Sequence, residues 1–205
     1  MSSVLNRKKK KMQPLGYTKQ ELVSIQNYAR KQSKTNYLIE ESYMNIRLIG
    51  YQILHDKFGF GQKRIIRVEQ TIDEYLNSVA DGGMSTEQLQ FFLKEKCKID
   101  VKDEANKVPF RERFALTEHK ISAQSMQSAG SYLLASICNY FSLLGVCLKT
   151  QFKFSARQIK DVYEWVRYYI GSISMGYETM TGVASVLEWE CKYVDERFIG
   201  KTYEV

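Results

Sequence analysis

The 205-residue sequence contains few of the residues on which metal sites and crosslinked folds depend. It has two histidines, two prolines and four cysteines. Neither His55 nor His119 has a second histidine, cysteine or carboxylate at metal-ligand spacing, which argues against a zinc enzyme. The four cysteines include no Cys-x-x-Cys spacing and indicate buried thiols in a reducing cytoplasm rather than a disulfide framework. We therefore expect a cytoplasmic protein without a metal.

Catalytic and cofactor-binding motifs are also missing. The chain has no Gly-x-x-x-x-Gly-Lys-Ser loop and no Gly-x-Gly-x-x-Gly fingerprint. Asp100, Val101 and Lys102 match only the end of a metal-dependent nuclease motif, and its upstream partner is absent. Glu188 and Glu190 are two residues apart on an expected helix, so their side chains point in different directions. We predict no catalytic residue, no cofactor and no enzymatic activity.

Long apolar runs are scarce. Residues 12–26, which follow the first basic run, are polar, so the sequence predicts no secretory signal. No charged residue lies between Lys120 and Lys149, and that length raises the question of a membrane helix. Two glutamines, an asparagine and several serines interrupt the segment. We predict a core helix there and no membrane association.

Negative charge is nearly absent from the N-terminal segment. The whole chain has 30 Lys and Arg against 23 Asp and Glu, a net charge of +7. Residues 1–34 hold nine of these cations and only Glu21 as an anion, so their net charge is +8 and that of the remaining chain is −1. Such an arm is typical of a segment that binds phosphates, and the alternative is a solubilising terminus. The nine cations are Arg7, Lys8, Lys9, Lys10, Lys11, Lys19, Arg30, Lys31 and Lys34.

The sequence resembles itself at a distance of 94 residues. Residues 42–101 align without a gap on residues 136–195, and 13 of the 60 aligned positions are identical. Ordinary composition would give about four identities. Each segment begins with an apolar stretch long enough for five turns of helix. A Phe-x-Phe turn follows, and then two amphipathic helices. We predict a tandem duplication of a roughly three-helix unit.

Helix starts can be placed within both units. Ser85 with Gln88 and Ser155 with Gln158 have the spacing of capping boxes. Gly61 stands at the position that corresponds to Ser155 and can begin a helix without a side-chain bond.

The fold class follows from the near absence of alternating apolar patterns. We expect an all-α fold of seven or more helices, in which the two units pack as one compact, pseudo-twofold body. A short helix over residues 18–34, opened by a capping box from Thr18 to Glu21, is expected to end the basic arm. The expected organisation is arm and short helix at 1–34, repeat unit one at 35–98, a polar linker at 99–116 and repeat unit two at 117–205.

Three cations stand where the start of a helix disfavours positive charge. Lys63, Arg64 and Arg67 fall in the first two turns of an expected helix, where the macrodipole costs about 0.3 to 1 kcal/mol per cation. A phosphate bound at this helix start would offset that cost. The alternative is a solvated helix end whose charges meet Glu69 or Asp73.

The second unit is less charged and richer in aromatic residues than the first. Residues 119–205 have nine cations and eight anions, against 12 and 14 in residues 35–118. We expect the second unit to be the buried or partner-binding half. The candidate partner-binding residues are Trp165, Tyr168 and Tyr177.

Two functional hypotheses from different classes follow. In the first, the protein is an accessory protein, typical in style of a phage or mobile element, that binds nucleic acid or a nucleoprotein through the arm and the three helix-start cations. This hypothesis predicts steep salt dependence. In the second, it is an adaptor or inhibitor that masks a surface of a host protein with its aromatic second unit, in a complex that survives moderate salt. A cleft between the units that holds a small ligand would leave no trace in the sequence.

Overall fold

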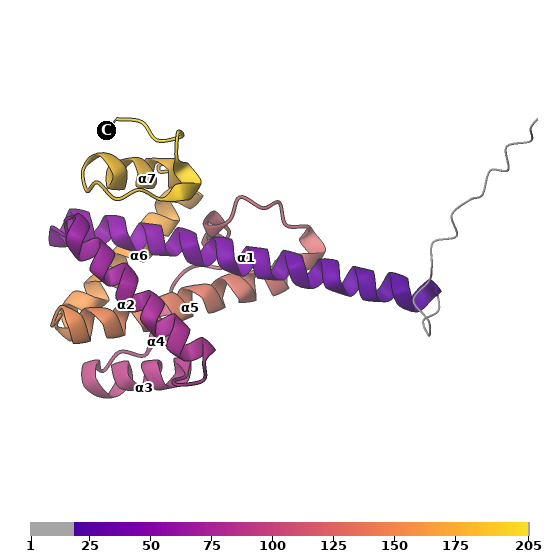
Figure 1. Ribbon diagram of the computed structural model, residues 1–205, viewed down its shortest axis with the longest axis horizontal. Coiled ribbons are helices and arrows are strands. Elements are labelled where there is room, and N and C mark those ends of the chain that lie inside the picture. The colour runs from indigo at the N-terminus through magenta and orange to yellow at the C-terminus, as the bar shows by residue number, and fades with distance from the viewer. Residues whose placement is uncertain (1–18, 205) are drawn as a thin grey trace, which may run out of the picture. The chain divides into compact units, whose positions relative to one another are not determined.

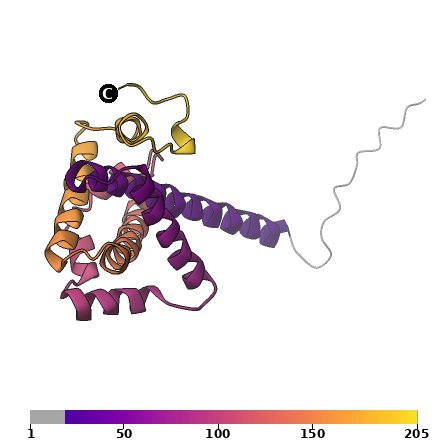
Figure 2. The same ribbon diagram turned by 60° about the vertical axis from the view of Figure 1, so that its left-hand side comes forward.

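The computed structural model describes residues 19–204, and all regular elements in that range are helices (Figures 1 and 2). The predicted all-α fold with seven helices is confirmed for this part of the chain. The α-helices are α1 (Lys19–Phe58), α2 (Gln62–Ala80), α3 (Thr86–Cys97), α4 (Val101–Asn106), α5 (Met126–Gln151), α6 (Ala156–Ser174) and α7 (Met180–Trp189). Short 3-10 helices cover Glu112–Leu116, Ala123–Ser125 and Glu196–Phe198.

The described residues belong to two parts, divided after Asn36. The first part consists of the opening turns of α1, where most of the described side chains are exposed. The second part, from Tyr37 onwards, is a compact body with one hydrophobic core.

The expectation of a short, separate helix over residues 18–34 is wrong. α1 continues without interruption to Phe58, because residues 19–49 contain neither glycine nor proline to end it. The polar residues at positions 32–36 have adequate helix propensity and do not break the helix. The capping box expected at Thr18 lies outside the described residues.

α5 is the central helix of the core. All nine residues from Tyr140 to Leu148 are buried, as the uncharged run predicted for a core helix. The segment Ala123–Gln151 is long and apolar enough to cross a membrane by length and composition, and 67% of its most apolar window is buried inside the protein. Gly145 permits close packing, because a Cβ at this position would lie 2.1 Å from the hydroxyl of Tyr163 on α6.

The third helix of each predicted unit packs at the edge of the body, and α3 and α7 lie on opposite sides of it in both views (Figures 1 and 2). α3 contacts α5, where Leu93 approaches Gly145. The segment after α7 contacts α1, where the rings of Tyr193 and Tyr51 meet edge to face at 5.4 Å.

The predicted helix starts are confirmed. Ser85 and Ser155 each accept a bond from the backbone N–H three residues on, and Gln88 and Gln158 complete the capping boxes. Gly61 begins α2 without a side-chain bond, as expected.

Left-handed backbone conformations recur at a fixed spacing. Of the seven described residues with positive φ, six form three pairs whose members are 94 residues apart. The pairs are Gly59 and Lys153 (φ 60° and 58°), Gly82 and Gly176 (74° and 76°), and Lys98 and Lys192 (54° and 58°).

The segment expected as a polar linker is largely built into the core. Residues 99–116 include α4 and a 3-10 helix, and Ile99, Val108 and Leu116 are fully buried. Asp100 caps α4 by accepting bonds from the backbone N–H groups of Lys102 and Asp103, which gives this triplet a structural role. The apolar residues between the charged ones explain why the segment packs inside rather than looping over the surface.

Candidate anion-binding surface

Two segments of the body are unusually basic. Residues 57–67 and residues 149–160 each contain four cations and no Asp or Glu. Each segment covers the end of one long helix, the Phe-x-Phe turn and the start of the next helix. We call the two segments together the basic corner. Its cations are Lys57, Lys63, Arg64, Arg67, Lys149, Lys153, Arg157 and Lys160.

Four phenylalanine rings join the two segments. Phe58 packs on Phe154 with ring centroids 5.2 Å apart, and Phe60 packs on Phe152 at 5.0 Å. Phe60 also meets Phe154 edge to face at 6.0 Å. We call these rings the phenylalanine cluster. It brings together cations that are about 90 residues apart in the sequence.

The two arginines of α2 are ordered by aromatic rings. The guanidinium of Arg64 lies 4.6 Å from the ring centroid of Phe60, and that of Arg67 lies 5.6 Å from Phe152. Arg64 also donates to the carbonyl of Gly59, and Arg67 donates to the side chain of Gln151 at 3.0 Å. Cation–π contacts of this kind hold the guanidinium in place while its remaining N–H groups face solvent.

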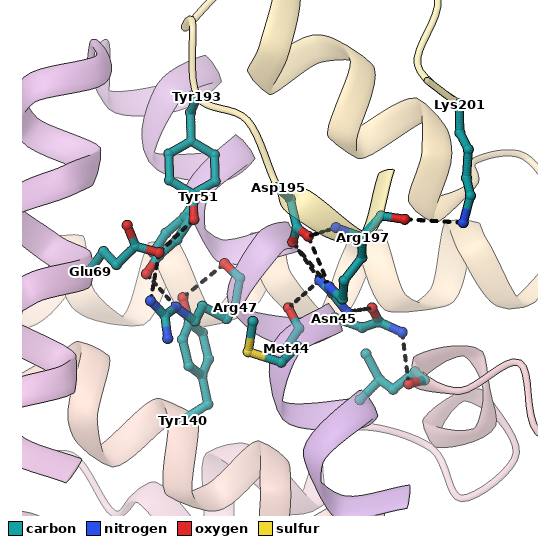
Figure 3. Close-up of polar contacts among 11 residues, drawn as sticks. Met44, Asn45, Arg47, Tyr51, Glu69, Tyr140, Tyr193, Asp195, Arg197 and Lys201 are labelled. Atoms are coloured by element: carbon teal, nitrogen blue, oxygen red, sulfur yellow. Dashed lines mark hydrogen bonds and ion pairs between the residues drawn. The ribbon is translucent and has the colours of Figure 1, made fainter. Parts of the chain in front are cut away.

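Lys63, Arg64 and Arg67 are exposed to solvent, as the alternative interpretation of the α2 helix start expects, but Glu69 and Asp73 do not neutralise them, so that part of the interpretation is wrong. Both carboxylates pair instead with the buried Arg47, Glu69 at 2.7 Å (Figure 3) and Asp73 at 2.9 Å. Lys63 is exposed and makes no hydrogen bond or ion pair within residues 19–204. The cations at the start of α2 are therefore free to meet an anion from outside.

The Arg47 site is structural. Arg47 is 8% exposed and also donates to the hydroxyl of Tyr51, while Tyr193 donates to Glu69 at 2.6 Å (Figure 3). Burial acts to lower the pKa of Arg47, but its contacts with Tyr51, Asp73 and Glu69 outweigh burial and raise the pKa above its ordinary value. Four of the five N–H groups of this buried, always-charged guanidinium are bonded within the protein, which gives Arg47 a structural role.

A pocket opens beside the basic corner. Its volume is about 400 Å³, and it is lined by Phe92 and Lys96 of α3 and by Lys149, Thr150 and Lys153 around the end of α5. We call it the lysine pocket. Lys149 donates to the carbonyl of Phe154 at 3.3 Å, and Lys153 donates to that of Thr150 at 2.9 Å. The lining contains three ammonium groups and no carboxylate.

Most of the cations predicted for the basic arm lie outside the described residues. Arg7 and Lys8–Lys11 precede residue 19. Lys19, Arg30, Lys31 and Lys34 belong to α1, and Lys34 is exposed.

The predicted partner-binding aromatics are all exposed, by 36% for Trp165, 63% for Tyr168 and 81% for Tyr177. Trp165 and Tyr168 meet edge to face at 5.6 Å on α6, and Lys57 lies over the Trp165 ring at 4.2 Å. Tyr177 lies in the turn between α6 and α7.

Other candidate chemistry finds no support in the described residues. His55 contacts the carbonyl of Phe60 at 2.9 Å and Glu190 at 3.3 Å, and no group of three potential metal ligands occurs in residues 19–204. Cys97, Cys147 and Cys191 are buried, and burial raises the pKa of Cys147 to about 12. Such thiols are poor nucleophiles.

A second pocket, of about 340 Å³, lies between α3, α4 and α5. Cys138 contributes to its lining and accepts a hydrogen bond from Gln90. Burial raises the pKa of Cys138 as well, so it offers no thiolate to a ligand.

Sequence reasoning singled out Lys63, Arg64 and Arg67 but missed Lys57, Lys96, Lys149 and Lys153. The absence of any carboxylate from residues 149–160 was the available signal. Comparison of the chain with protein-family models, curated proteins and solved structures found no match.

Proposed function

We propose that this protein is a non-enzymatic helical binding protein that binds nucleic acid, alone or within a nucleoprotein, through the phosphate backbone. The basic corner carries the proposal. Residues 35–205 have 21 cations and 22 carboxylates; eight of the cations lie in the corner, which leaves 13 cations against 22 carboxylates elsewhere. Charge segregated in this way favours a polyanion over a neutral or basic partner.

The side chains of the corner suit phosphate. Arg64 and Arg67 present planar guanidinium groups whose stems are already ordered on Phe60 and Phe152. Ordering before binding lowers the entropy cost of each contact. The nine cations of residues 1–34 would add electrostatic attraction along the same ligand.

We further infer that the body is a tandem duplication with pseudo-twofold symmetry. Helix α2 (Gln62–Ala80) and helix α6 (Ala156–Ser174) have equal lengths and begin 94 residues apart. α3 and α7 also begin 94 residues apart. The three pairs of left-handed residues have the same spacing.

Contacts between the halves support the symmetry. Tyr75 bonds to Thr150 at 3.1 Å, and Tyr169 donates to Asp56 at 3.0 Å. The two bonds correspond to one another under the symmetry. Tyr169 lies 94 residues after Tyr75, and Thr150 lies 94 residues after Asp56. Ser42 donates to its own counterpart, Ser136, at 2.9 Å, as residues on a twofold axis would. Under this symmetry two equivalent basic turns meet at the phenylalanine cluster.

The test is fluorescence anisotropy of labelled single-stranded and duplex DNA and RNA with 5′-hydroxyl ends, titrated from about 50 to 200 mM salt. We expect binding that weakens steeply with salt. Arg64→Gln/Arg67→Gln should reduce the slope of log affinity against log salt by about 2 and weaken binding at low salt by about tenfold or more.

A matched control removes the same charge elsewhere. Arg111 and Lys120 are exposed and lie near the opposite end of α5 from the basic corner. Arg111→Gln/Lys120→Gln should leave affinity within about twofold of the native value. Absence of binding at low salt, or equal losses in both double variants, contradicts the proposal.

A protein-binding function is the second candidate, because Tyr177 and Tyr168 expose more than half of their surface. Aromatic residues are enriched in the centres of interfaces. In this case Trp165→Ala/Tyr168→Ala would abolish a complex that survives moderate salt, and Arg64→Gln/Arg67→Gln would not.

A further inference from the structure

The lysine pocket differs from its counterpart in the other half of the body. Lys96 corresponds to Glu190, and Lys149 corresponds to His55, each at a distance of 94 residues. Glu190 and His55 contact one another at 3.3 Å. One half therefore supplies its own carboxylate at this place, whereas the other half has a second ammonium group where the carboxylate would be.

We propose that the lysine pocket binds a phosphoryl group with two negative charges, namely a phosphate monoester or inorganic phosphate. Three like charges around one pocket repel one another, and a bound dianion removes that repulsion. Lys149 and Lys153 each use one N–H bond on a backbone carbonyl and keep two for a ligand. Lys96 makes no hydrogen bond or ion pair among the described residues and keeps all three.

The rest of the lining fits the same ligand. The Thr150 hydroxyl lines the pocket but donates to the Val146 carbonyl at 2.8 Å and bonds to Tyr75 at 3.1 Å, so the lysines supply the donors for a ligand. Phe92 offers a ring against which a sugar or base attached to the phosphate can pack. A backbone phosphodiester has one negative charge, whereas a terminal phosphate has nearly two, which suits three cations better.

This inference deepens the proposed function, because a terminal phosphate of a bound nucleic acid is one source of the dianion. A free phosphate compound is the other source. The pocket itself is tested without nucleic acid, so that its failure and the failure of the proposed function remain distinguishable.

The first experiment measures the melting temperature of the full chain in inorganic phosphate and in sodium chloride at equal ionic strength. We expect phosphate at about ten times its Kd to raise the melting temperature by about 3 °C over chloride. Lys96→Gln/Lys149→Gln should lose this increase. Lys96→Glu, which copies Glu190 of the other half, should also lose it, because the new carboxylate pairs with Lys149.

The control double variant again removes two exposed cations outside the basic corner, Arg111 and Lys120. Neither residue lines the pocket. Arg111→Gln/Lys120→Gln should keep at least two thirds of the increase. No increase over chloride in the native chain, or an undiminished increase in Lys96→Gln/Lys149→Gln, overturns the proposal.

The second experiment compares oligonucleotides with 5′-phosphate and 5′-hydroxyl ends. A preference of about fivefold or more for the phosphorylated end, lost in Lys96→Gln/Lys149→Gln, assigns the pocket to a nucleic-acid terminus. Equal affinities together with the thermal effect of inorganic phosphate assign it to a free phosphate compound. Both results support a phosphoryl site and differ only in its source.

Discussion

Interior positions that lie 94 residues apart in the body are filled with different chemistry. In the first half, Arg47 pairs with Glu69 at 2.7 Å. The residues 94 positions further on are Phe141 and Tyr163, whose rings stack in parallel with centroids 4.2 Å apart. An ion pair and an aromatic stack thus support the same helix packing, which teaches that the packing is specified by the apolar residues around them.

At the surface, the Phe-x-Phe turns keep the same rings and backbone conformation but differ in the charged residues around them. His55 contacts Glu190 beside the first turn, whereas the lysine pocket lies beside the second. Surface charges cost little stability to change, so they are free to acquire binding roles.

The largest expected effect concerns the buried phenols, one of which, Tyr163, lies 94 residues after the carboxylate Glu69. Burial raises the pKa of Tyr51, Tyr140 and Tyr163 well above the ordinary value. Their contribution to stability is complete below the unfolded pKa, near 10, and is lost as pH rises above it.

Between pH 10 and 11 the free energy of unfolding should fall by about 1 kcal/mol per phenol, or about 3 kcal/mol for the three together. Urea unfolding at a series of pH values measures this slope. Tyr163→Phe should reduce this loss by about 1 kcal/mol, the share of one phenol, and an unchanged slope would show that Tyr163 ionises in the folded state.

The next prediction tests whether the two halves contribute equally to one core. Leu54 and Leu148 are 94 residues apart and both fully buried. Leu54→Ala and Leu148→Ala should each lower the free energy of unfolding by about 3 kcal/mol, in a single cooperative transition. If one variant lowered the free energy of unfolding by less than about 1 kcal/mol while the other lost about 3 kcal/mol, the two positions would not contribute equally to the core.

The interior comparison can be tested by exchange. Arg47→Phe alone leaves the Tyr51 hydroxyl and two carboxylates without their partner and should cost about 2 kcal/mol in unfolding free energy. Adding Glu69→Tyr copies the Phe141–Tyr163 stack and should recover about 1 kcal/mol, measured as a double-mutant cycle. A double variant less stable than Arg47→Phe would mean that the ion pair is required in its half.

The smallest expected effect concerns the left-handed turn residues. Gly59 has open space where a Cβ would stand, so Gly59→Ala should cost about 1 kcal/mol through its positive φ alone. Lys153, at the equivalent position, should gain up to about 1 kcal/mol when changed to glycine. Lys153→Ala serves as the control, because it removes the charge and keeps the strained conformation. Equal stability of the alanine and glycine variants would contradict this account.

Much of the fold was accessible from local patterns. The stripes of α2 and α6, the caps at Ser85 and Ser155 and the uncharged core helix are properties of short segments, and each is present as expected. The prediction of a short N-terminal helix was wrong because residues 32–36 include no glycine or proline that would end a helix. The prediction of a polar linker was wrong because the burial of these residues depends on packing against α5, which the local composition of the segment does not reveal.

The candidate surface was only partly accessible, for a related reason. Lys63, Arg64 and Arg67 stood out because a helix start disfavours cations, which is a local effect. Lys96 and Lys149 are unremarkable within their own helices. They matter because tertiary packing places both around one pocket.

The sequence by itself determined the helical class, the main helix starts and the internal likeness at 94 residues, because helix periodicity, capping and glycine conformations depend on near neighbours. Tertiary structure alone decided which carboxylates form ion pairs with Arg47 and which cations lie together around the phenylalanine cluster. Those outcomes depend on long-range packing, since a charge becomes available to a ligand only when no residue of the folded chain neutralises it.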